Sequence, residues 1–405
     1  MKNIIVGQSG GPTAVINASL YGVITEGKRY PDLVGCVYGM HNGIEGFLKD
    51  DYENLSETLS DSDLELLKHT PAAYLGSCRY KLPEDLSSPF YPTLFEKLEA
   101  LNIGYFLYIG GNDSMDTVSK LSRYADKHNS SIRFIGIPKT IDNDLVLTDH
   151  TPGYGSAAKY VASTVREICL DASVYQTPAV TIVEIMGRHA GWLTAASCLA
   201  RANGAKGPDF IYLCEVPFSI DTFLKDVKAK LEEQDAVIIA VSEGVKNKDG
   251  RYISEEVQSS AVDSFGHSYI AGAAKVLEDA VRNEIGCKVR SIELNLMQRC
   301  AAHLASATDI QESRMLGKAA CQYALEGAGG MMAAVIRTSD KPYATEFKAL
   351  PVCDIANAIK SVPADYINDA GNDVTEKMVD YLTPLIQGEM NTVYENGIPK
   401  YIYLY

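Results

Sequence analysis

One pattern constrains the fold more than any other feature of this sequence: a short apolar segment leads into a glycine-rich or polar turn, and a helix-like segment follows. The pattern occurs at residues 4–24, at residues 105–127 and at residues 179–200. Short apolar runs without alternation are typical of strands buried on both faces of a parallel sheet. Strands that alternate with helices predict a mainly parallel sheet with helices on both faces. The chain is therefore expected to be an α/β protein.

The alternation continues through most of the chain. Further strands are expected at residues 34–38, 132–137, 211–215, 236–241, 288–295 and 331–337, and further helices at 91–101, 156–170, 220–233, 268–284 and 309–326. A length of 405 residues suggests two or three domains, at roughly 150 residues each. The tail beyond about residue 351 is mixed and rich in tyrosine. We expect its tyrosines to pack against the body of the protein or to lie at a subunit interface.

The most polar strand end is the stretch Pro138-Lys139-Thr140-Ile141-Asp142-Asn143-Asp144, directly after the apolar run 132–137. The carboxyl ends of strands are where open α/β sheets bind their ligands. A carboxylate there could accept a proton from a hydroxyl group, and a lysine could hold a phosphate. The alternative is an ordinary strand-to-loop turn, because such turns are often rich in Asp and Asn.

Glycine-rich turns follow two other strands. The turn at residues 7–13 would direct backbone N–H groups and a helix N-terminus at a phosphate, although it matches neither the dinucleotide nor the P-loop pattern. The alternative is a plain turn in which glycine is needed only for backbone shape. Taken together, four strand ends offer backbone donors, carboxylates, one lysine and one arginine: Gly10-Gly11, residues 110–114, residues 139–144 and residues 186–188. That combination suits phosphoryl transfer.

Composition excludes several classes of partner. The formal net charge of −15 argues against a nucleic-acid or anionic-membrane surface, so an anionic substrate would need local basic groups. No apolar run approaches the ~20 residues of a membrane helix, and the first residues resemble a strand more than a signal peptide. The nine cysteines form no C-x-x-C pair, which favours reduced thiols in a cytoplasmic protein. His150 and Trp192 are interpreted as structural residues.

The motifs resemble those of the phosphofructokinase family, over roughly residues 4–335. In family order they are Gly10-Gly11 with Asn17, Gly110-Gly111-Asn112-Asp113-Ser114, residues 138–144, Met186-Gly187-Arg188, Ser242-Glu243-Gly244 and Gln298-Arg299. Six such motifs in order are hard to attribute to chance. The resemblance implies two three-layer α/β/α Rossmann-like domains with the active site between them and a C-terminal extension on the body. We expect a larger domain of residues 1–147 with about 268–316, a smaller one of 148–267 with about 317–350, and the extension at 351–405.

The resemblance also implies roles for individual residues. Asp142 would be the base for the 1-hydroxyl of fructose 6-phosphate, and Thr140 would contact the sugar or the transferring phosphate. The sugar phosphate would be bound by Met186, Gly187, Arg188, Glu243, Gln298 and Arg299, with Arg188 also near the transition-state charge and Arg290 reaching a neighbouring subunit. The phosphoryl donor would be bound by Gly10, Gly11, Arg79, Asp113, Ser114 and Lys139. Mg²⁺ would be held by Asn112, Asp113 and Asp144.

Two positions indicate the phosphoryl donor. Relatives that use ATP carry glycine at the positions of Asp113 and Lys139, which leaves room for the nucleotide. Here an aspartate would intrude on and repel a nucleotide phosphate, whereas a lysine could neutralise pyrophosphate. The chain therefore resembles the pyrophosphate-dependent members. The alternatives are an ATP-dependent enzyme, a non-catalytic sugar-phosphate sensor and a protein related to NAD kinases.

Three positions depart from the family pattern. Asn112 stands where the family usually has a metal-binding aspartate, which removes one charge from the metal site. Ala179 replaces an arginine that binds sugar phosphate, and Leu296 replaces a polar sugar contact. The resemblance implies a homodimer or homotetramer whose sites are completed across an interface.

Overall fold

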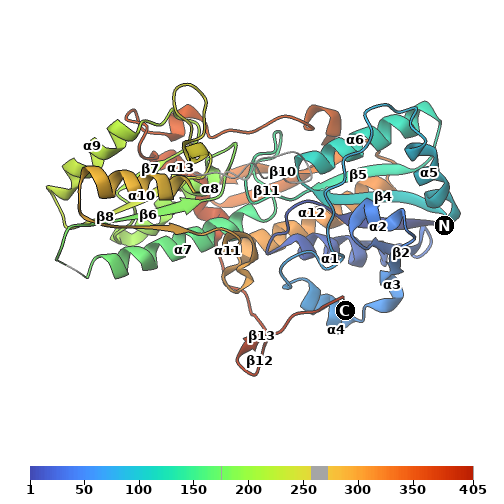
Figure 1. Ribbon diagram of the computed structural model, residues 1–405. Coiled ribbons are helices and arrows are strands. Elements are labelled where there is room, and N and C mark those ends of the chain that lie inside the picture. Colours follow the sequence, from blue (N-terminus) through green and yellow to red (C-terminus); the bar gives the residue numbers. More distant parts are fainter. Residues whose placement is uncertain (175, 257–271, 405) are drawn as a thin grey trace.

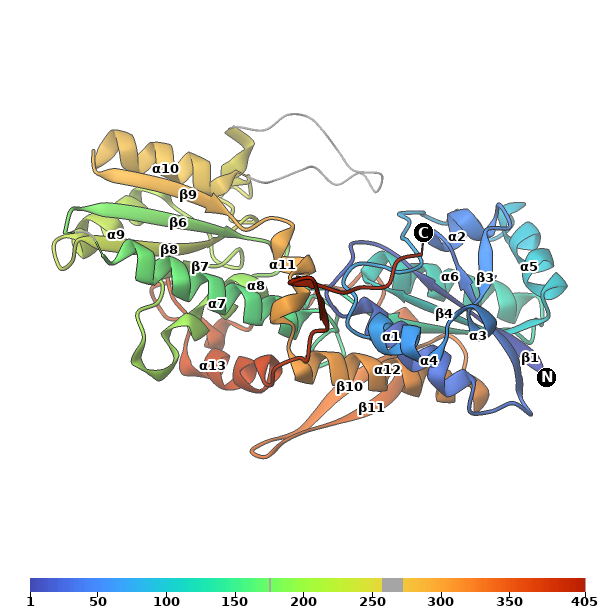
Figure 2. The same ribbon diagram turned by 90° about the horizontal axis from the view of Figure 1, so that it is seen from below.

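The computed structural model describes residues 1–174, 176–256 and 272–404, which form two lobes, each built on its own sheet (Figures 1 and 2). The large lobe has a seven-stranded sheet of order β11-β10-β5-β4-β1-β2-β3. The small lobe has a four-stranded sheet of order β7-β8-β6-β9. The strands of the large lobe are β1 (Lys2–Gln8), β2 (Val34–Met40), β3 (Tyr52–Asn54), β4 (Ile103–Gly110), β5 (Arg133–Pro138), β10 (Met331–Asp340) and β11 (Tyr343–Pro351). Those of the small lobe are β6 (Ala179–Ile185), β7 (Phe210–Tyr212), β8 (Ala236–Ser242) and β9 (Lys288–Glu293).

Helices cover both faces of the large sheet. One apolar core joins it to α1 (Ile16–Gly27) and α12 (Ala307–Leu325), and a second joins it to α5 (Phe90–Ala100) and α6 (Asn112–Lys127). Strands β1, β2, β4 and β5 are mutually parallel, so their carboxyl ends lie at one edge. Three short helices lie close to each other in the chain: α2 (Gly43–Phe47) follows β2, and α3 (Leu55–Thr58) and α4 (Asp61–Leu67) follow β3.

The small lobe has the same three layers, and its four strands are all parallel. One face packs on α7 (Tyr154–Ala172), α8 (Trp192–Ala195) and the 3-10 helix η1 (Ala196–Gly204). The other face packs on α9 (Ile220–Leu231) and α10 (Ala273–Glu284). The predicted fold class, two α/β/α units with mainly parallel sheets, is therefore confirmed.

Two strands lie in the other lobe from the one expected. Strand β9 pairs with β6, so residues 288–293 belong to the small sheet and not to the larger domain. Strand β10 pairs with β5 at Met331↔Ile135, so residues 331–340 belong to the large sheet. An apolar run predicts a strand but not which sheet it joins, because that choice depends on long-range pairing. The helix expected at 268–284 is α10, which begins at Ala273, and residues 268–271 lie outside the described part of the chain.

The C-terminal part packs across both lobes. Strand β11, which was not expected, pairs antiparallel with β10, and the chain then passes from η4 (Val352–Asp354) beside α6 to η5 (Ala364–Tyr366), α13 (Glu376–Leu382) and η6 (Thr383–Ile386) on the small lobe (Figure 1). Tyr366 and Tyr381 pack around Trp192, with ring centroids 6.2 and 5.1 Å from that of Trp192. The expected packing of the tail on the body is thus confirmed for these tyrosines.

Near the C-terminus, strands β12 (Tyr394–Glu395) and β13 (Ile398–Pro399) form a hairpin that projects from the body (Figure 1). The chain then returns to the large lobe, where the N–H of Ile402 donates to Thr70 Oγ1 at 3.1 Å. The remaining short helices described are η2 (Ile253–Glu256), α11 (Met297–Cys300) and η3 (Ala302–Leu304). Within the described ranges, no helix has both the length and the apolar character needed to cross a bilayer.

Candidate active site

The polar stretch after β5 forms a tightly held loop at the carboxyl edge of the large sheet. Lys139 continues the strand ladder, because its N–H donates to Gly110 O at 2.9 Å. Thr140 Oγ1 accepts a hydrogen bond from the N–H of Asp142 at 3.1 Å, which turns the chain away from the sheet. Asn143 then takes the left-handed conformation, with φ of +55°, and is fully buried. The loop geometry is thus fixed before any ligand is considered.

Three cations from separate segments meet above the first glycine-rich turn. The Lys139 side chain is only 2% exposed, and its ammonium group donates to Gly11 O. A Cβ atom on Gly11 would lie 3.0 Å from Arg299 Nη1, so Arg299 reaches the same turn. Burial, together with the charges of Arg299 and Arg79, lowers the pKa of Lys139 to about 7, against the opposing charges of Asp142 and Asp144. Cations that repel one another in a buried site are expected to bind an anion there.

The turn at Gly10-Gly11 is held by the segment that carries Arg79. Gly10 donates its N–H to Cys78 O at 3.1 Å, and Ser77 Oγ donates to Gly10 O at 2.6 Å. Gly10 has φ of +76°, a conformation that glycine adopts without strain. These bonds explain how residues so far apart in sequence share one anion site.

Asp142 faces this cluster from the adjacent side. Its carboxyl group is surrounded by protein, and burial together with the charge of Glu243 raises its pKa to about 6, against the opposing charges of Arg188, Lys139 and Arg299. At neutral pH it is mostly ionised and can accept a proton.

The small lobe contributes the next group of residues. Glu243 Oε1 accepts from the N–H of Gly187 at 3.2 Å, and burial raises the pKa of Glu243 to about 7. Arg188 Nε is buried and has no hydrogen-bond partner within the described chain. A buried guanidinium donor of this kind calls for an anionic or polar ligand.

The carboxylates of Asp144 and Asp113 could hold a divalent cation only together with phosphate oxygens of the substrates. Burial raises the pKa of Asp144 to about 7, and the neighbouring charges of Asp142 and Asp113 contribute to the shift. A bound cation favours the ionised forms of acidic groups that lie close together, because it offsets the repulsion between them. Among the described residues, however, no group of three His, Cys, Asp or Glu side chains could hold a metal alone. This donor set fits Mg²⁺, which takes one or two carboxylates and completes its shell with water and substrate phosphates.

Three predicted ligands already have partners inside the protein. Asn112 Nδ2 donates to Ala358 O at 2.7 Å and its Oδ1 accepts from the N–H of Asn357 at 2.6 Å, which argues against its expected role as a metal ligand. Ser114, in the first turn of α6, donates through Oγ to Ser9 Oγ, just after β1, at 3.0 Å. Gln298 Oε1 accepts from the N–H of Met186 at 3.1 Å, so Gln298 positions the Met186 segment. None of these long-range partners is visible in the sequence.

Arg290 lies apart from the cluster around Asp142. It is exposed on the outer strand β9, where it lines a hollow of about 260 Å³ that also contains Ala179. Ala179 offers no charge. The other charged residues that line the hollow are the acidic Glu167 and Asp171 and the basic Lys288. Its expected contact with a neighbouring subunit stays a prediction.

One charged residue next to the site was missed in the sequence. Lys360, in the C-terminal extension, donates through Nζ to Asp149 O at 2.6 Å, to Thr148 O at 3.2 Å and to Asn143 Oδ1 at 3.3 Å. These partners lie more than 200 residues away along the chain, so no local pattern signals the contact.

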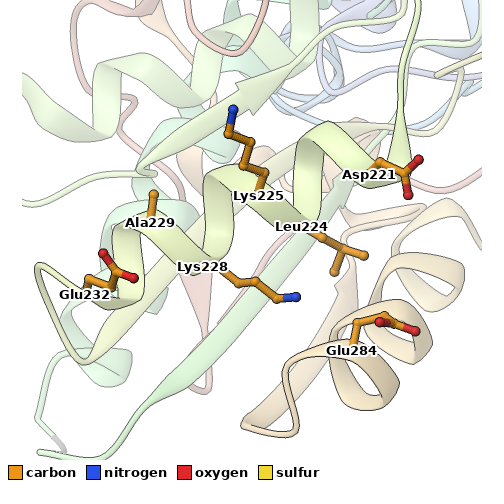
Figure 3. Close-up of a pocket in the computed structure, with 7 residues that line it drawn as sticks. All are labelled: Asp221, Leu224, Lys225, Lys228, Ala229, Glu232 and Glu284. Carbon is orange, nitrogen blue, oxygen red and sulfur yellow. The ribbon is translucent and has the colours of Figure 1, made fainter.

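A second hollow, of about 410 Å³, carries none of the predicted residues. It lies between α9 and the end of α10 and is lined by Asp221, Leu224, Lys225, Lys228, Ala229, Glu232 and Glu284 (Figure 3). The hollow is open to solvent, and its charged side chains, which carry both signs, lie on exposed helix surfaces. It is therefore a poorer candidate for the reaction site than the buried cluster around Lys139 and Asp142.

Comparison with known proteins agrees with the geometry. The Phosphofructokinase family model matches residues 3–324. The chain is 41% identical to the pyrophosphate–fructose 6-phosphate 1-phosphotransferase of Halomonas elongata, over 98% of this chain and 95% of that protein. It is 39% identical to the protein of the same name from Methylococcus capsulatus, over 100% and 96% of the two chains. It also superposes on the solved structure of a pyrophosphate-dependent phosphofructokinase from Nitrosospira multiformis with a TM-score of 0.90 and 35% identity, covering 99% of this chain and 96% of that one. The chain belongs to the phosphofructokinase family.

Proposed function

We propose that this protein transfers a phosphoryl group from pyrophosphate to the 1-hydroxyl of fructose 6-phosphate, giving fructose 1,6-bisphosphate and phosphate. The observation that carries the proposal is the buried cation cluster of Lys139, Arg299 and Arg79 over the Gly10-Gly11 turn, facing the Asp142 carboxylate. The names of the relatives support both substrates. The free energies of pyrophosphate hydrolysis and of sugar phosphorylation lie closer together than they do with ATP, so the step is expected to run in either direction, in glycolysis or gluconeogenesis.

At the acceptor end, Asp142 accepts the proton of the 1-hydroxyl as the sugar oxygen attacks the terminal phosphorus. The bridging P–O bond breaks, and phosphate leaves. Arg188, with its buried Nε, neutralises charge on the transferring group, and Thr140 is placed by its bond to Asp142 to contact the same group. Met186, Gly187 and Glu243 are proposed to bind the sugar phosphate, together with Arg299, whose guanidinium also reaches the Gly10-Gly11 turn of the donor end.

At the donor end, the Gly10-Gly11 turn and Arg79 hold pyrophosphate and Lys139 neutralises the leaving phosphate. Lys139 is held close to that turn by its bond to Gly11 O and fills space beside Gly10, where a Cβ atom would lie 3.5 Å from its Nζ. Bound anion would favour the protonated form of Lys139, whose pKa of about 7 leaves it half-charged in the free protein at neutral pH.

Mg²⁺ is the proposed cofactor, held by Asp144 and Asp113 together with phosphate oxygens. It supplies positive charge that offsets the charge of the phosphates. The side chains named above carry out proton transfer and positioning.

The proposed assembly is a homodimer or homotetramer. The exposed position of Arg290 on an outer strand supports a contact with a second copy. Light scattering would measure the mass in solution, and Arg290→Ala would be expected to raise KM for fructose 6-phosphate with little change in KM for pyrophosphate. A monomer in solution with full activity would contradict the shared site.

The activity is tested by supplying purified protein with fructose 6-phosphate, Mg²⁺ and one donor at a time, and coupling the product to aldolase. We expect fructose 1,6-bisphosphate with pyrophosphate. If neither pyrophosphate nor ATP gives product, while fructose 6-phosphate still binds, the protein is a sugar-phosphate sensor and the proposed reaction is wrong.

A further inference from the structure

Residues 357–362, called here the crossing segment, connect both lobes at the edge of the candidate active site. At its start the two hydrogen bonds of Asn112 hold Asn357 and Ala358 against the first turn of α6 in the large lobe. At its end the N–H of Val362 donates to Glu215 Oε1 of the small lobe at 2.9 Å. In Figure 1 the chain crosses here from α6 toward α13. The segment is therefore fixed at both ends, one on each lobe.

Lys360 lies in the middle of the crossing segment and binds the active-site loop from behind. Its N–H donates to Asp144 O at 2.8 Å, and its ammonium group donates to the three oxygens of Asn143, Thr148 and Asp149. An ammonium group has three donors, so all of them are used on the loop. Its carbonyl oxygen accepts from Trp192 Nε1 at 2.8 Å, which ties the same residue to the small lobe.

The ammonium group of Lys360 differs from that of a lysine in an ordinary ion pair, because none of its direct partners among the described residues is a carboxylate. Its direct partners are two backbone carbonyls and one amide oxygen, and its ammonium group lies 5.0 Å from the centre of the Trp192 ring. Burying a cation against neutral oxygens costs desolvation, so such a group is a weak source of stability. It does, however, fix the positions of the carbonyls to which it donates, because each must point at one nitrogen atom.

We infer that Lys360 is a positioning residue for phosphoryl transfer: it sets the loop 142–149 against both lobes and so places Asp142 and Asp144 at the start of that loop. The inference rests on the proposed function. Lys360 acts through the loop and needs no contact with substrate. Since a misplacement of about 1 Å can cost on the order of 10²-fold in rate, a loop carbonyl left without its donor would lower kcat more than it raises KM.

Lys159 offers a matched control for Lys360. It is a buried lysine, 8% exposed, whereas Lys360 is half-buried, and it too docks the C-terminal extension by donating to a backbone carbonyl, that of Gly388 at 2.6 Å. It lies on α7 and contacts neither the loop nor the crossing segment in any hydrogen bond given for the described residues. Lys360→Met and Lys159→Met therefore both take an ammonium group away from backbone carbonyl acceptors, and both are expected to lower the unfolding temperature because those carbonyls lose their donor.

The first test compares the two variants in steady-state kinetics with pyrophosphate. Lys360→Met is expected to lower kcat about 10-fold or more and to change the KM for either substrate by less than about 3-fold, whereas Lys159→Met keeps the kcat of the unaltered protein. Equal kcat in the two variants would overturn the inference and leave the proposed reaction intact.

A second test does not depend on activity. Hydrogen–deuterium exchange is measured on peptides that cover residues 142–150, in both variants and in the unaltered protein. Lys360→Met is expected to speed exchange in this loop, and Lys159→Met is not. Unchanged exchange in Lys360→Met would overturn the positioning role even if the protein catalysed a different reaction.

Discussion

At the scale of single residues, the roles of Asp142 and of its surroundings can be separated. Its pKa of about 6 lies above the value of 3.8 for a free aspartate. The folded protein therefore disfavours the ionised form of Asp142, and at neutral pH, where the group is mostly ionised, this charge lowers the stability of the fold. An aspartate kept only for stability would not be placed there. A base that must accept a proton at neutral pH gains from a pKa near the working pH.

Replacing Asp142 by Asn should therefore separate activity from stability. We expect kcat to fall by roughly 10²-fold or more, because the base is lost. The unfolding temperature at neutral pH should stay the same or rise, because a disfavoured charge is removed. Steady-state kinetics and thermal unfolding of the same preparation check both parts; a loss of activity that only parallels a loss of stability would contradict the role.

His150 has the opposite character, and the interpretation as a structural histidine agrees with its contacts. It is 2% exposed and lies between Asp149 Oδ1 at 2.8 Å and Glu312 Oε2 at 2.7 Å. Burial alone would lower its pKa, but Glu312 and Asp149 outweigh it and raise the pKa to about 9. The protonated ring thus joins the loop after the active site to α12.

The pH dependence of stability follows from this pKa. A histidine with a raised pKa stabilises the fold fully below its unfolded value of about 6.5 and loses this contribution as the pH rises through about 9. His150→Gln should lower the unfolding temperature, and the gap to the unaltered protein should be widest at pH 6 and narrow toward pH 9.5. A gap that does not change over this range would show that His150 is not charged in the folded protein.

Single residues also show where sequence reasoning reached its limit. Lys139 and Asp142 could be predicted because a strand end delivers both within a few residues. The partners of Asn112 could not, because Asn357 and Ala358 meet it only after the chain has formed both lobes. Lys360 was missed for the same reason, since nothing near it in sequence marks it as a neighbour of the loop.

At the scale of elements, the contact between α1 and α12 depends on close backbone approach. A Cβ atom on Gly22 would lie 2.2 Å from Arg314 O, and one on Gly317 would lie 2.1 Å from Ser19 O. The two helices form one layer of the large lobe beneath β1, whose carboxyl end leads into the Gly10-Gly11 turn. Their spacing therefore bears on the position of the donor site.

Gly317→Ala tests this packing by the sign of its effect. Helix propensity alone predicts a gain of about 1 kcal/mol for alanine over glycine in a helix. The backbone contact predicts the reverse, a loss of about 1–3 kcal/mol from overpacking. We expect a loss, measured by denaturant unfolding, with Gln311→Ala on the exposed face of α12 as the control. A more stable Gly317→Ala protein would show that the helices can separate at little cost.

Elements as units were mostly predictable, and their partners were not. The recurrent strand, turn and helix pattern identified every strand of the small sheet and β1, β2, β4, β5 and β10 of the large one. It misplaced β9 and β10, since the lobe that each strand joins is decided by pairing with β6 and β5. Strand β11 was not predicted; its burial alternates between exposed and half-buried residues, which lacks the apolar run used to find the others.

At the scale of the whole molecule, the two lobes bring together a site that neither contains alone. The large lobe provides the Gly10-Gly11 turn, Lys139 and Asp142, and the small lobe provides Arg188 and Glu243. The local cation cluster is set against a net charge of −15, so the site selects an anion by buried geometry and not by the overall field. The C-terminal extension then links the lobes through the crossing segment.

The central claim is that this site takes its phosphoryl group from pyrophosphate, and the ratio of kcat/KM for pyrophosphate to kcat/KM for ATP tests it most directly. For the unaltered protein, with saturating fructose 6-phosphate and Mg²⁺, we predict a ratio of about 10² or more, because Asp113 and the buried Lys139 suit a short donor. The variant with both residues replaced by glycine should lower that ratio and use ATP better than the unaltered protein does. A ratio below 1 for the unaltered protein would contradict the account.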